Sequence, residues 1–578
     1  MTAAQILPLA VVAPLIGAVA APLACRWSRR LGLGLALASV AVTLAVLAAC
    51  APRIYRGDII VSYLGHWRPT GGGILGVTLT GDAFGLTGAL VAASIGALAL
   101  LATVSGLADA GPRELGGYTC LSLLLIAGAV AGTLTADLLN MFVWFEVVAL
   151  SSYALTGFFL ERPTAVEAAF KIVVLTSIAG FSVFIATALL YQEHGAVNLA
   201  QLHDSLSAHP APATVAAIGL LVAGFSTKAG LVPFGGWLPD AYTAAPGPIT
   251  ALFAGVMVNF DIVALGRMTY LLTPPAHLPV PGLLMVIGSF SAVVGAMFAF
   301  TQTNLKRLLA YDTISQLGIV VVGMATASTT GVAGMVYHLI SHALFKAMLF
   351  LVAGAIIQAT GAVDLPDLAG IARRNPALVA LFLLGAAAIA GVPPLNGYAS
   401  VGLIHSALLE QHQYVPYAAT LAAQIITVGA LARAVRAMFR SSDTAFADDR
   451  PIRPGMTTAL VILAGACLAT GIWPPLILRA IVAPATSVLI HGAAWSHAVL
   501  AGGGHLTPVT VTFDYTDPVE LTTIAVCLVA GIGLMLATES RLPRWRERLT
   551  SVATGSVNDY ALYMAAGTAA TCLALLLA

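Results

Sequence analysis

The sequence predicts an all-α membrane protein with about 16 transmembrane helices (14 to 16), and two observations lead to this fold class. Of the 578 residues, 59% are hydrophobic and only 9% are charged, whereas soluble domains carry about 25% charged residues. Apolar runs of roughly 20 residues, long enough to cross a bilayer, recur along the whole chain. Little sequence remains between these runs, so we expect no large soluble domain.

Each apolar run is one expected transmembrane helix, and the basic residues between the runs orient these helices. The expected spans are 5–25, 31–51, 81–105, 117–135, 137–158, 165–191, 212–232, 247–272, 278–301, 307–326, 331–358, 376–408, 415–435, 456–478, 519–538 and 557–577. Lys and Arg concentrate on the cytoplasmic side of membrane proteins. With the N-terminus outside, only Arg53, Arg56, Arg68 and Arg479 fall in outer loops. This alternation supports the count and predicts that both termini face outside.

The first run and the last outer loop need separate arguments. Residues 5–25 lack a preceding basic stretch and are followed at once by further spans, which predicts a retained helix and not a cleaved signal peptide. The outer loop 479–518 contains a short apolar stretch, which is either shallow or re-entrant. Its His491, His497 and His505 match no metal-ligand spacing, and the six Cys form no CxxC pair. We therefore expect no metal site, disulfide framework or cofactor.

Two spans contain residues that a regular helix cannot sustain. The seventh continues from Lys228 into "AGLVPFGGWLP", and the twelfth contains "AGVPPLNGY". Broken helices at membrane depth line cavities or ion sites. Because the breaks lie five spans apart, equivalent positions run in opposite directions, which predicts two inverted five-helix repeats with discontinuous helices 7 and 12. The predicted units are 1–116 (helices 1–3), 117–272 (helices 4–8), 273–440 (helices 9–13) and 441–578 (helices 14–16 with the outer loop).

Lysine is rare in this chain, and three of the lysines lie inside spans. The lysines are Lys171, Lys228, Lys306 and Lys346. A buried Lys can give up its proton, whereas Arg stays charged, so lysines inside the membrane suit a proton relay. The alternative is a composition bias with a few lysines that extend to the membrane surface. Lys171, near a span end, fits either interpretation, whereas Lys228 and Lys346 favour the relay.

Two of the carboxylates inside expected spans are candidate site residues. Glu146 lies in the middle of the apolar run 137–155, where a carboxylate costs about 2.5–3.5 kcal/mol. We expect Lys228 to be its counter-charge, because pairing lowers this cost. Such a pair acts as a switch if Lys228 moves or loses its proton; the alternative is a static buried ion pair. Asp261 is the second carboxylate, and it either pairs with Lys228 or binds a cation.

A stripe of three titratable residues is expected on the eleventh span. His338, His342 and Lys346 are spaced i, i+4, i+8, which places them on one face of a helix over roughly 12 Å. Histidine exchanges protons near neutral pH, so the stripe suits a proton relay. Two alternatives stay open: histidines that only form structural hydrogen bonds, and ligands of a metal or haem iron.

Five stretches together resemble the antiporter-like subunit superfamily shared by Mrp-type Na+/H+ antiporters, respiratory complex I and membrane-bound, energy-converting NiFe hydrogenases. They are "DLLNMFVWFEVVALSSYAL", "FSTKAGLVPFGGWLPDAYTAAPGPITALFAG", "NLKRLLAYDTISQLG", "YHLISHALFKAMLFLVAG" and "IAGVPPLNGY". The resemblance covers roughly residues 80–410 and implies inverted repeats with proton movement along a central polar axis. It also implies that Glu146 and Lys228 match the glutamate of helix 5 and the lysine of helix 7. His338, His342 and Lys346 match the stripe of helix 11, Lys171 and Lys306 match commonly basic positions, and Asp82 falls where an aspartate is frequent.

The sequence departs from the family pattern at three positions. Many relatives have a lysine at the position of Asn259, a lysine or glutamate at that of Val401, and a histidine at that of Gly235. The expected group at the exit of the second half is therefore missing. His405 is a candidate substitute for Val401, because position i+4 lies on the same helix face. Otherwise the route leaves elsewhere, or the subunit conducts poorly.

These observations predict an ion-translocating subunit, carrying H+ alone or H+ against Na+, within a larger complex in a bacterial-type inner (plasma) membrane. The expected route runs from Glu146 to Lys228 and then through His338, His342 and Lys346. The chain has no nucleotide loop or Fe–S cysteine set, so redox chemistry would belong to partner subunits of a NADH dehydrogenase-like or hydrogenase-like complex. We expect other membrane subunits and lipid as partners, and no nucleic acid. The alternatives are a non-conducting structural subunit and a coupling subunit of an inorganic-carbon uptake complex.

Overall fold

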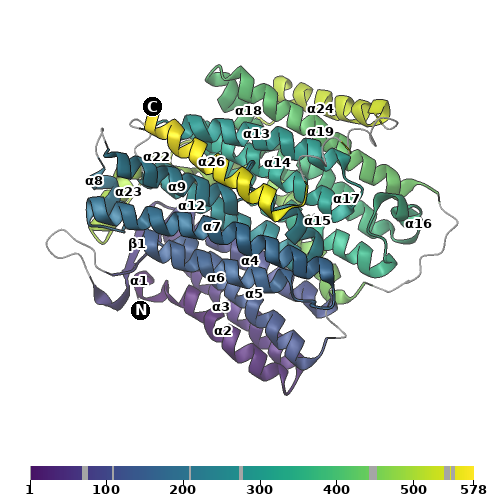
Figure 1. Cartoon of the computed structure of the whole chain (residues 1–578), viewed down its shortest axis with the longest axis horizontal. Helices are drawn as coiled ribbons and strands as arrows, with labels where there is room; N and C mark the ends of the chain where they lie inside the picture. Colours follow the sequence, from purple (N-terminus) through teal and green to yellow (C-terminus); the bar gives the residue numbers. More distant parts are fainter. Residues whose placement is uncertain are drawn as a thin grey trace.

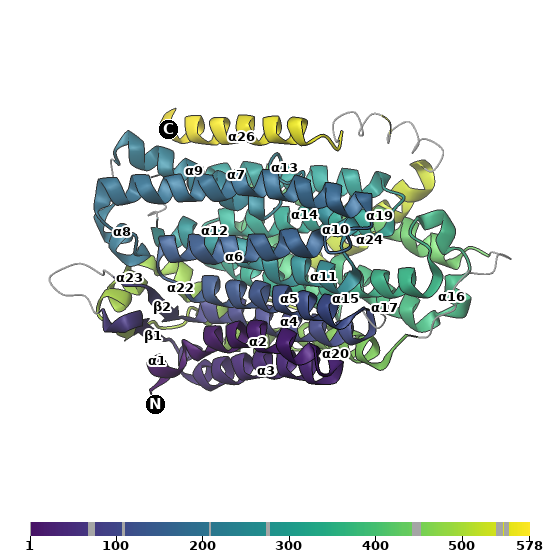
Figure 2. The ribbon, with the colours of Figure 1, turned by 60° about the horizontal axis from the view of Figure 1, so that its bottom comes forward.

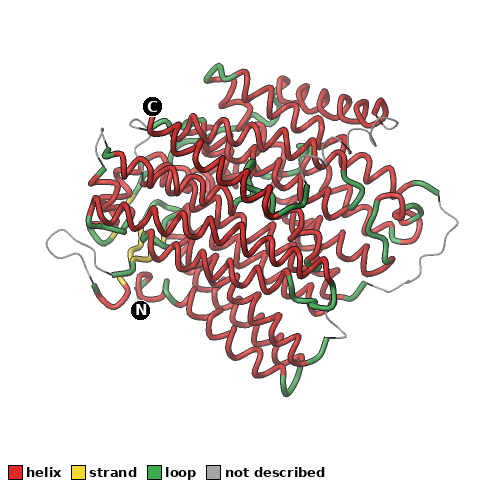
Figure 3. The backbone as a smooth tube through the Cα atoms, in the orientation of Figure 1, coloured by secondary structure: helices red, strands yellow, loops and turns green. Residues whose placement is uncertain are grey.

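The computed structural model describes residues 2–67, 76–106, 110–206, 210–272, 278–441, 452–538, 547 and 554–577. In these residues, 14 helices are long and apolar enough to cross a membrane, or up to 16 if two bent helix pairs each count as one span. The predicted all-α multi-pass fold and its span count are therefore confirmed. The long helices lie side by side, with most connections at the two ends of the bundle (Figure 3).

The helices follow the expected spans closely. They are α2 (Leu9–Cys25), α3 (Arg29–Ile54), α4 (Ala83–Gly106), α5 (Pro112–Leu134), α6 (Leu138–Thr156), α7 (Pro163–His194), α9 (Pro212–Lys228), α11 (Gly247–Leu252), α12 (Val258–Arg267), α13 (Val280–Thr301), α14 (Leu305–Ala325), α15 (Thr329–Thr360), α17 (Pro376–Ile389), α18 (Asn396–Glu410), α19 (Tyr414–Phe439), α20 (Pro454–Ile472), α24 (Pro518–Thr538) and α26 (Val557–Leu577). Two π-helical stretches, η2 (Phe253–Met257) and η3 (Met268–Leu272), flank α12 and complete the eighth span.

Shorter helices connect or cap the long ones. They are α1 (Ala3–Ile6), α8 (Leu199–Ser205), α10 (Leu238–Ala244), α16 (Ile371–Arg374) and the short 3-10 helices η1 (Leu64–His66) and η4 (Leu365–Leu368). Both chain ends lie at the same end of the bundle (Figures 1 and 2), as an even number of crossings requires. In Figure 2, α26 runs along one edge and α2 and α3 along the opposite edge. Some of the arginines between the expected spans, on which the predicted orientation rests, lie outside the described residues. They are Arg68, Arg450, Arg541, Arg544, Arg546 and Arg548.

Both predicted breaks are present, and they have the same local structure. The helices before them, α9 and α17, end in a glycine with positive φ, Gly230 (φ 75°) and Gly391 (φ 74°). After the first, the Leu231 N–H donates to the Ser226 carbonyl at 2.9 Å; after the second, the Val392 N–H donates to the Ala387 carbonyl at 3.0 Å. This 6→1 hydrogen bond is the Schellman motif, which stops a helix at a glycine. The chain then continues through α10 after the first break and α18 after the second.

A small antiparallel sheet, which the sequence did not predict, lies at the end of the bundle that holds both termini (Figure 2). It has the order β2-β1-β3, with β1 (Asp58–Tyr63) between β2 (Thr78–Gly81) and β3 (Gly503–His505). Asp58 pairs in register with His505, whose side chain lies 3.2 Å from the Asp58 carboxylate. This hydrogen bond with His505 lowers the pKa of Asp58. The sheet joins residues more than 400 positions apart, which no local pattern can predict.

The expected outer loop 479–518 begins with short helices, and they contain the apolar stretch that was expected to be shallow or re-entrant. The chain forms α21 (Pro474–Ile477), η5 (Leu478–Val482), α22 (Ala483–Ile490) and α23 (Gly492–Leu500), with a bend of 85° before α23. Residues 483–489 are buried, and α22 packs against α4 and α15. An apolar helix gains stability by covering other apolar surface, so this segment folds onto the bundle. His491, His497 and His505 are exposed.

Candidate functional site

Glu146 and Lys228 lie on neighbouring helices, but no direct ion pair joins them. Lys228 is the last residue of α9, at the first break, and its Nζ lies 4.3 Å from the centroid of the Phe145 ring. Within the described part of the chain, neither Lys228 Nζ nor Glu146 Oε1 has a hydrogen-bond partner. Glu146 Oε1 instead lies against Gly180 of α7, where an added Cβ would collide with it. Lys228 is therefore near Glu146, as expected of a counter-charge, but its ammonium group contacts an aromatic face and the carboxylate lies against α7.

Asp261 extends this cluster along α12. It is buried, and Lys228 lies within electrostatic range of its carboxylate, although they form no ion pair. The Tyr242 side chain of α10 is likewise buried and within electrostatic range of Asp261. Asn259 donates to the Gly255 carbonyl at 2.8 Å, inside the π-helical stretch η2. Such stretches are frequent at functional sites, and this one directly precedes the segment that contains Asn259 and Asp261.

Lys171 and Lys306 contact α10, the short helix that follows the first break. Lys171 forms ion pairs with Glu167 at 2.5 Å and with Asp240 of α10 at 2.8 Å. Asp240 also pairs with Arg307 of α14 at 2.8 Å. Lys306 donates to the carbonyl oxygens of Thr243 and Ala245, at the end of α10. Both lysines therefore have two protein partners each, and their contacts join α10 to α7 and α14.

The predicted stripe on α15 is fully buried, and Lys346 has a partner that the sequence analysis missed. His338, His342 and Lys346 have no exposed surface. Lys346 Nζ pairs with Asp312 of α14 at 2.5 Å, and the Thr427 hydroxyl of α19 donates to the other carboxylate oxygen at 3.2 Å. Asp312 carries the same signal as Glu146, an acidic residue inside an apolar run, so the sequence could have revealed it.

The two histidines of the stripe have different surroundings. His338 Nδ1 lies 2.9 Å from the Ser400 hydroxyl of α18, and its Nε2 lies 3.1 Å from Gln316 Oε1 of α14. In the described residues, neither ring nitrogen of His342 has a protein partner. The described residues also contain no group of three His, Cys, Asp or Glu side chains placed to hold a metal. His338 is therefore held between α14 and α18 by hydrogen bonds, whereas His342 is buried without such contacts in the described structure.

At the second break, a glutamate from a distant helix approaches the position of the missing exit group. His405 of α18 is buried, and its Nδ1 lies 3.3 Å from both carboxylate oxygens of Glu520 in α24. Glu520 is also buried, and an added Cβ at Gly402 would lie 3.3 Å from its Cγ. Val401, directly before Gly402, is buried as well. The sequence pattern points to His405 and not to Glu520, because Glu520 lies at the start of an expected span and resembles an ordinary interfacial acid.

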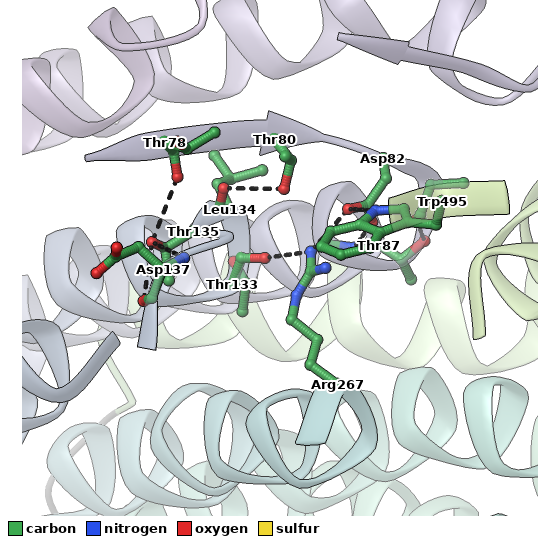
Figure 4. A network of polar contacts seen from close by, with 12 residues as sticks. Thr78, Thr80, Asp82, Thr87, Thr133, Leu134, Thr135, Asp137, Arg267 and Trp495 are labelled. Atoms are coloured by element: carbon green, nitrogen blue, oxygen red, sulfur yellow. Dashed lines mark hydrogen bonds and ion pairs between the residues drawn. The ribbon is translucent and has the colours of Figure 1, made fainter. Parts of the chain in front are cut away.

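Asp82 belongs to a separate network near the sheet (Figure 4). Its carboxylate pairs with Arg267 of α12 at 2.9 Å, and neither side chain is exposed. Arg267 also donates to the Thr133 carbonyl at 2.9 Å, and the Trp495 indole of α23 donates to Asp82 at 3.1 Å. Four helices meet here, which indicates a structural role for this aspartate.

These observations define a class: a multi-pass membrane protein with two broken helices and a row of buried titratable groups between them. A family model described as "NADH:quinone oxidoreductase/Mrp antiporter, TM" matches residues 135–427, a range that contains most of this row. The chain belongs to this family.

Relatives and solved structures agree with this assignment. NADH-quinone oxidoreductase subunit N of Desulforudis audaxviator is 32% identical over 456 residues, 77% of this chain and 89% of the relative. A Na(+)/H(+) antiporter subunit of Alkalihalophilus pseudofirmus is 31% identical over 379 residues, 65% of this chain and 75% of the relative. A chain of an archaeal respiratory membrane complex, the membrane-bound sulfane sulfur reductase, superposes with a TM-score of 0.78 at 26% identity, over 86% of this chain and 99% of that chain.

Proposed function

We propose that this chain is an ion-translocating subunit of a multisubunit membrane complex and carries protons, alone or in exchange for Na+, along its buried titratable groups. The observation that carries the proposal is the position of the buried polar atoms without a protein hydrogen-bond partner. In the described part of the chain they include Glu146 Oε1, Lys228 Nζ, Tyr242 OH, Asp261 Oδ2, both nitrogens of His342 and His405 Nε2. The residues that carry these atoms lie on the helices of the row of titratable groups, which are α6, α9, α10, α12, α15 and α18.

Buried polar atoms without a protein partner normally bind water. An unsatisfied buried group costs about 1–3 kcal/mol, so keeping several of them in one row is unfavourable unless water reaches them. Water between carboxylate, lysine and histidine groups supplies the short steps that proton exchange needs. Asp312, Lys346 and His338 have protein partners. In the proposed row they stand between the groups at which we expect water.

The proposed order of groups starts at Glu146 and Lys228 and continues through Asp261 and Tyr242. The Tyr242 ring lies 5.4 Å from that of Phe350, one turn beyond Lys346 on α15, so we place the junction of the two halves there. His338 lies within electrostatic range of Lys346 and His405. The route along α15 then runs from Lys346 through His342 to His338, the reverse of the order expected from the sequence.

The names of the relatives support the wider setting of this proposal. They include a subunit of an NADH-quinone oxidoreductase and one of a Na(+)/H(+) antiporter, so we propose that other membrane subunits are its partners in a bacterial inner membrane. We propose that both termini face outside, as the basic residues indicate. The matching Schellman motifs at Gly230 and Gly391 support the proposed inverted repeats, 117–272 and 273–440, between 1–116 and 441–578.

A second candidate function is a non-conducting structural subunit. Two observations favour it: the absence of a direct pair between Glu146 and Lys228 in the described residues, and an apolar Val401 at the expected exit. The two candidates make opposite predictions for variants that keep the complex intact.

The test is proton flux in proteoliposomes that contain the assembled complex, with Glu146→Gln and Lys228→Ala compared with the parent. Loss of a proton-transfer group typically costs about 10²–10⁴-fold in rate, so we expect flux to fall at least about tenfold in both variants. Glu161→Gln is the matched control, because Glu161 is an exposed carboxylate. Unchanged flux in assembled Glu146→Gln and Lys228→Ala complexes would favour the structural subunit.

A further inference from the structure

We propose that the proton route of the second half ends at the Glu520–His405 pair, with Glu520 of α24 supplying the carboxylate that α18 lacks at Val401. This inference rests on the proposed function and adds a residue from outside the two predicted repeats. The predicted second repeat ends at residue 440, so the exit group belongs to the C-terminal helices.

The position of Glu520 fits a replacement for the missing group. Its Cγ would lie 3.3 Å from a Cβ added at Gly402, the residue next to Val401, and the Phe513 ring would lie closer still, at 2.7 Å. Its carboxylate reaches His405, one turn further along α18, at 3.3 Å. A carboxylate and an imidazole in contact exchange a proton directly. Because His405 also lies within electrostatic range of His338, the pair continues the row that starts on α15.

The segment before α24 fixes Glu520 in this position. The Tyr398 hydroxyl of α18 donates to the Tyr515 carbonyl at 2.9 Å. The Tyr398 ring also packs against Phe513 and Tyr515, with centroid distances of 5.4 and 4.9 Å. The other titratable groups around the pair are Tyr398, Tyr417, Tyr515 and Cys527, which are uncharged at neutral pH, and the carboxylates of Asp514 and Asp517. Glu520 and His405 are the buried acid and base of this region.

A cleft of about 270 Å³ lies beside this region. Its lining includes Leu403 and Ser406 of α18, which are close to His405 in sequence, and the acidic residues Glu410, Asp514 and Asp517. The cleft lies where α15 begins and α18 ends. Acidic groups that line a cleft raise the local proton concentration, so this cleft is where the route of the proposal would meet the aqueous phase.

The free energy cost of Glu520 also points to a function. The α24 helix packs on α19, and its buried positions form one stripe: Glu520, Ile524, Cys527, Gly531, Met535 and Thr538. Glu520 is the only charged member of this stripe. Placing a carboxylate on the packed face of a membrane helix is unfavourable, whereas Gln would keep the shape of the side chain and its hydrogen bond without a charge.

The experiment measures proton flux in proteoliposomes with the assembled complex for Glu520→Gln and His405→Gln, beside Glu146→Gln. Glu193→Gln, an exposed carboxylate at the end of α7, is the matched control. We expect flux to fall at least about tenfold in both variants of the pair and to stay unchanged in the control. Normal flux in assembled Glu520→Gln complexes, together with lost flux in Glu146→Gln, would overturn this inference and leave the proposed function intact. Normal flux in both would overturn the proposed function itself.

A rescue experiment separates proton exchange from a structural role. In the Glu520→Gln background, Val401→Glu restores a titratable group on α18 itself, and Val401→Gln restores only the volume and polarity. We expect the Glu variant to recover flux and the Gln variant to recover none. Equal recovery by both would show that the position needs shape alone, and this result would overturn the proposal. If Glu520→Gln prevents assembly, His405→Gln tests the same pair from the other helix.

Discussion

Asp312 and Lys346 form an ion pair of 2.5 Å between α14 and α15, and neither side chain is exposed. Removing one member of a buried pair leaves an uncompensated charge, which costs about 3–5 kcal/mol. We therefore expect Lys346→Ala and Asp312→Asn each to lower the thermal stability of the complex markedly. Thermal unfolding of purified complexes measures the effect. A double variant, Asp312→Asn with Lys346→Gln, should be more stable than either single one; equal or greater loss would contradict this explanation.

Glu146 should behave differently from Asp312, although both are carboxylates in membrane helices. In the described structure, Glu146 Oε1 has no hydrogen-bond partner, so Glu146→Gln breaks no ion pair. We expect the midpoint of thermal unfolding to change little, while proton flux is lost. Measuring both quantities on one preparation separates the roles. A large loss of stability in Glu146→Gln would show that the carboxylate serves packing.

The Asp82–Arg267 pair gives a prediction about stability alone. Both side chains are fully buried, so Asp82→Asn leaves the guanidinium group without its counter-charge and should cost about 3–5 kcal/mol. The exposed pair Arg53–Asp58 is the control, because surface ion pairs contribute only about 0–1 kcal/mol. Arg53→Ala should therefore leave the melting temperature nearly unchanged. Flux per assembled complex should be the same in both variants, and reduced flux in Asp82→Asn would assign this network to the route.

The two breaks should differ in their tolerance to a methyl group. Ala at a positive φ costs about 1–2 kcal/mol at either Gly230 or Gly391. At Gly230, however, the added Cβ would also lie 2.5 Å from the Leu238 side chain, whereas at Gly391 the nearest atom, Gln424 Nε2, lies at 3.2 Å. We expect Gly230→Ala to destabilise the protein more than Gly391→Ala, as measured by unfolding temperature. The opposite ranking would mean that the Leu238 side chain moves away at little cost.

The helices and most of the candidate site residues can be predicted from the sequence because membrane helices are almost wholly apolar. Glu146, Lys228 and the stripe of α15 interrupt apolar runs. A charged residue stands out there, because a helix surrounded by lipid has no face that points to bulk water. Asp312 carries the same signal, so its omission does not reflect a limit of the sequence. What the sequence does not specify is side-chain direction. Lys228 and Glu146 are near in the fold, yet the ammonium group contacts Phe145 and the carboxylate contacts α7.

Contacts between segments that are distant in sequence are the second feature that the sequence does not predict. The pairing of β3 with β1 and the approach of Glu520 to His405 both join residues more than 100 positions apart, and neither has a local pattern. The same limit applies to residues 479–500, where the sequence leaves open a shallow or a re-entrant segment and the structure has short helices. The burial of this segment against α4 and α15 depends on surfaces that those helices present only after they have packed.

The packing around Gly402 has a consequence for the evolution of this chain. A Cβ at position 402 would lie 2.7 Å from the Phe513 ring and 3.3 Å from Glu520 Cγ. The glycine is therefore needed while Phe513, in the segment before α24, lies against α18, and the same contact brings Glu520 to His405. Positions 402, 513 and 520 should therefore change together when many relatives are aligned.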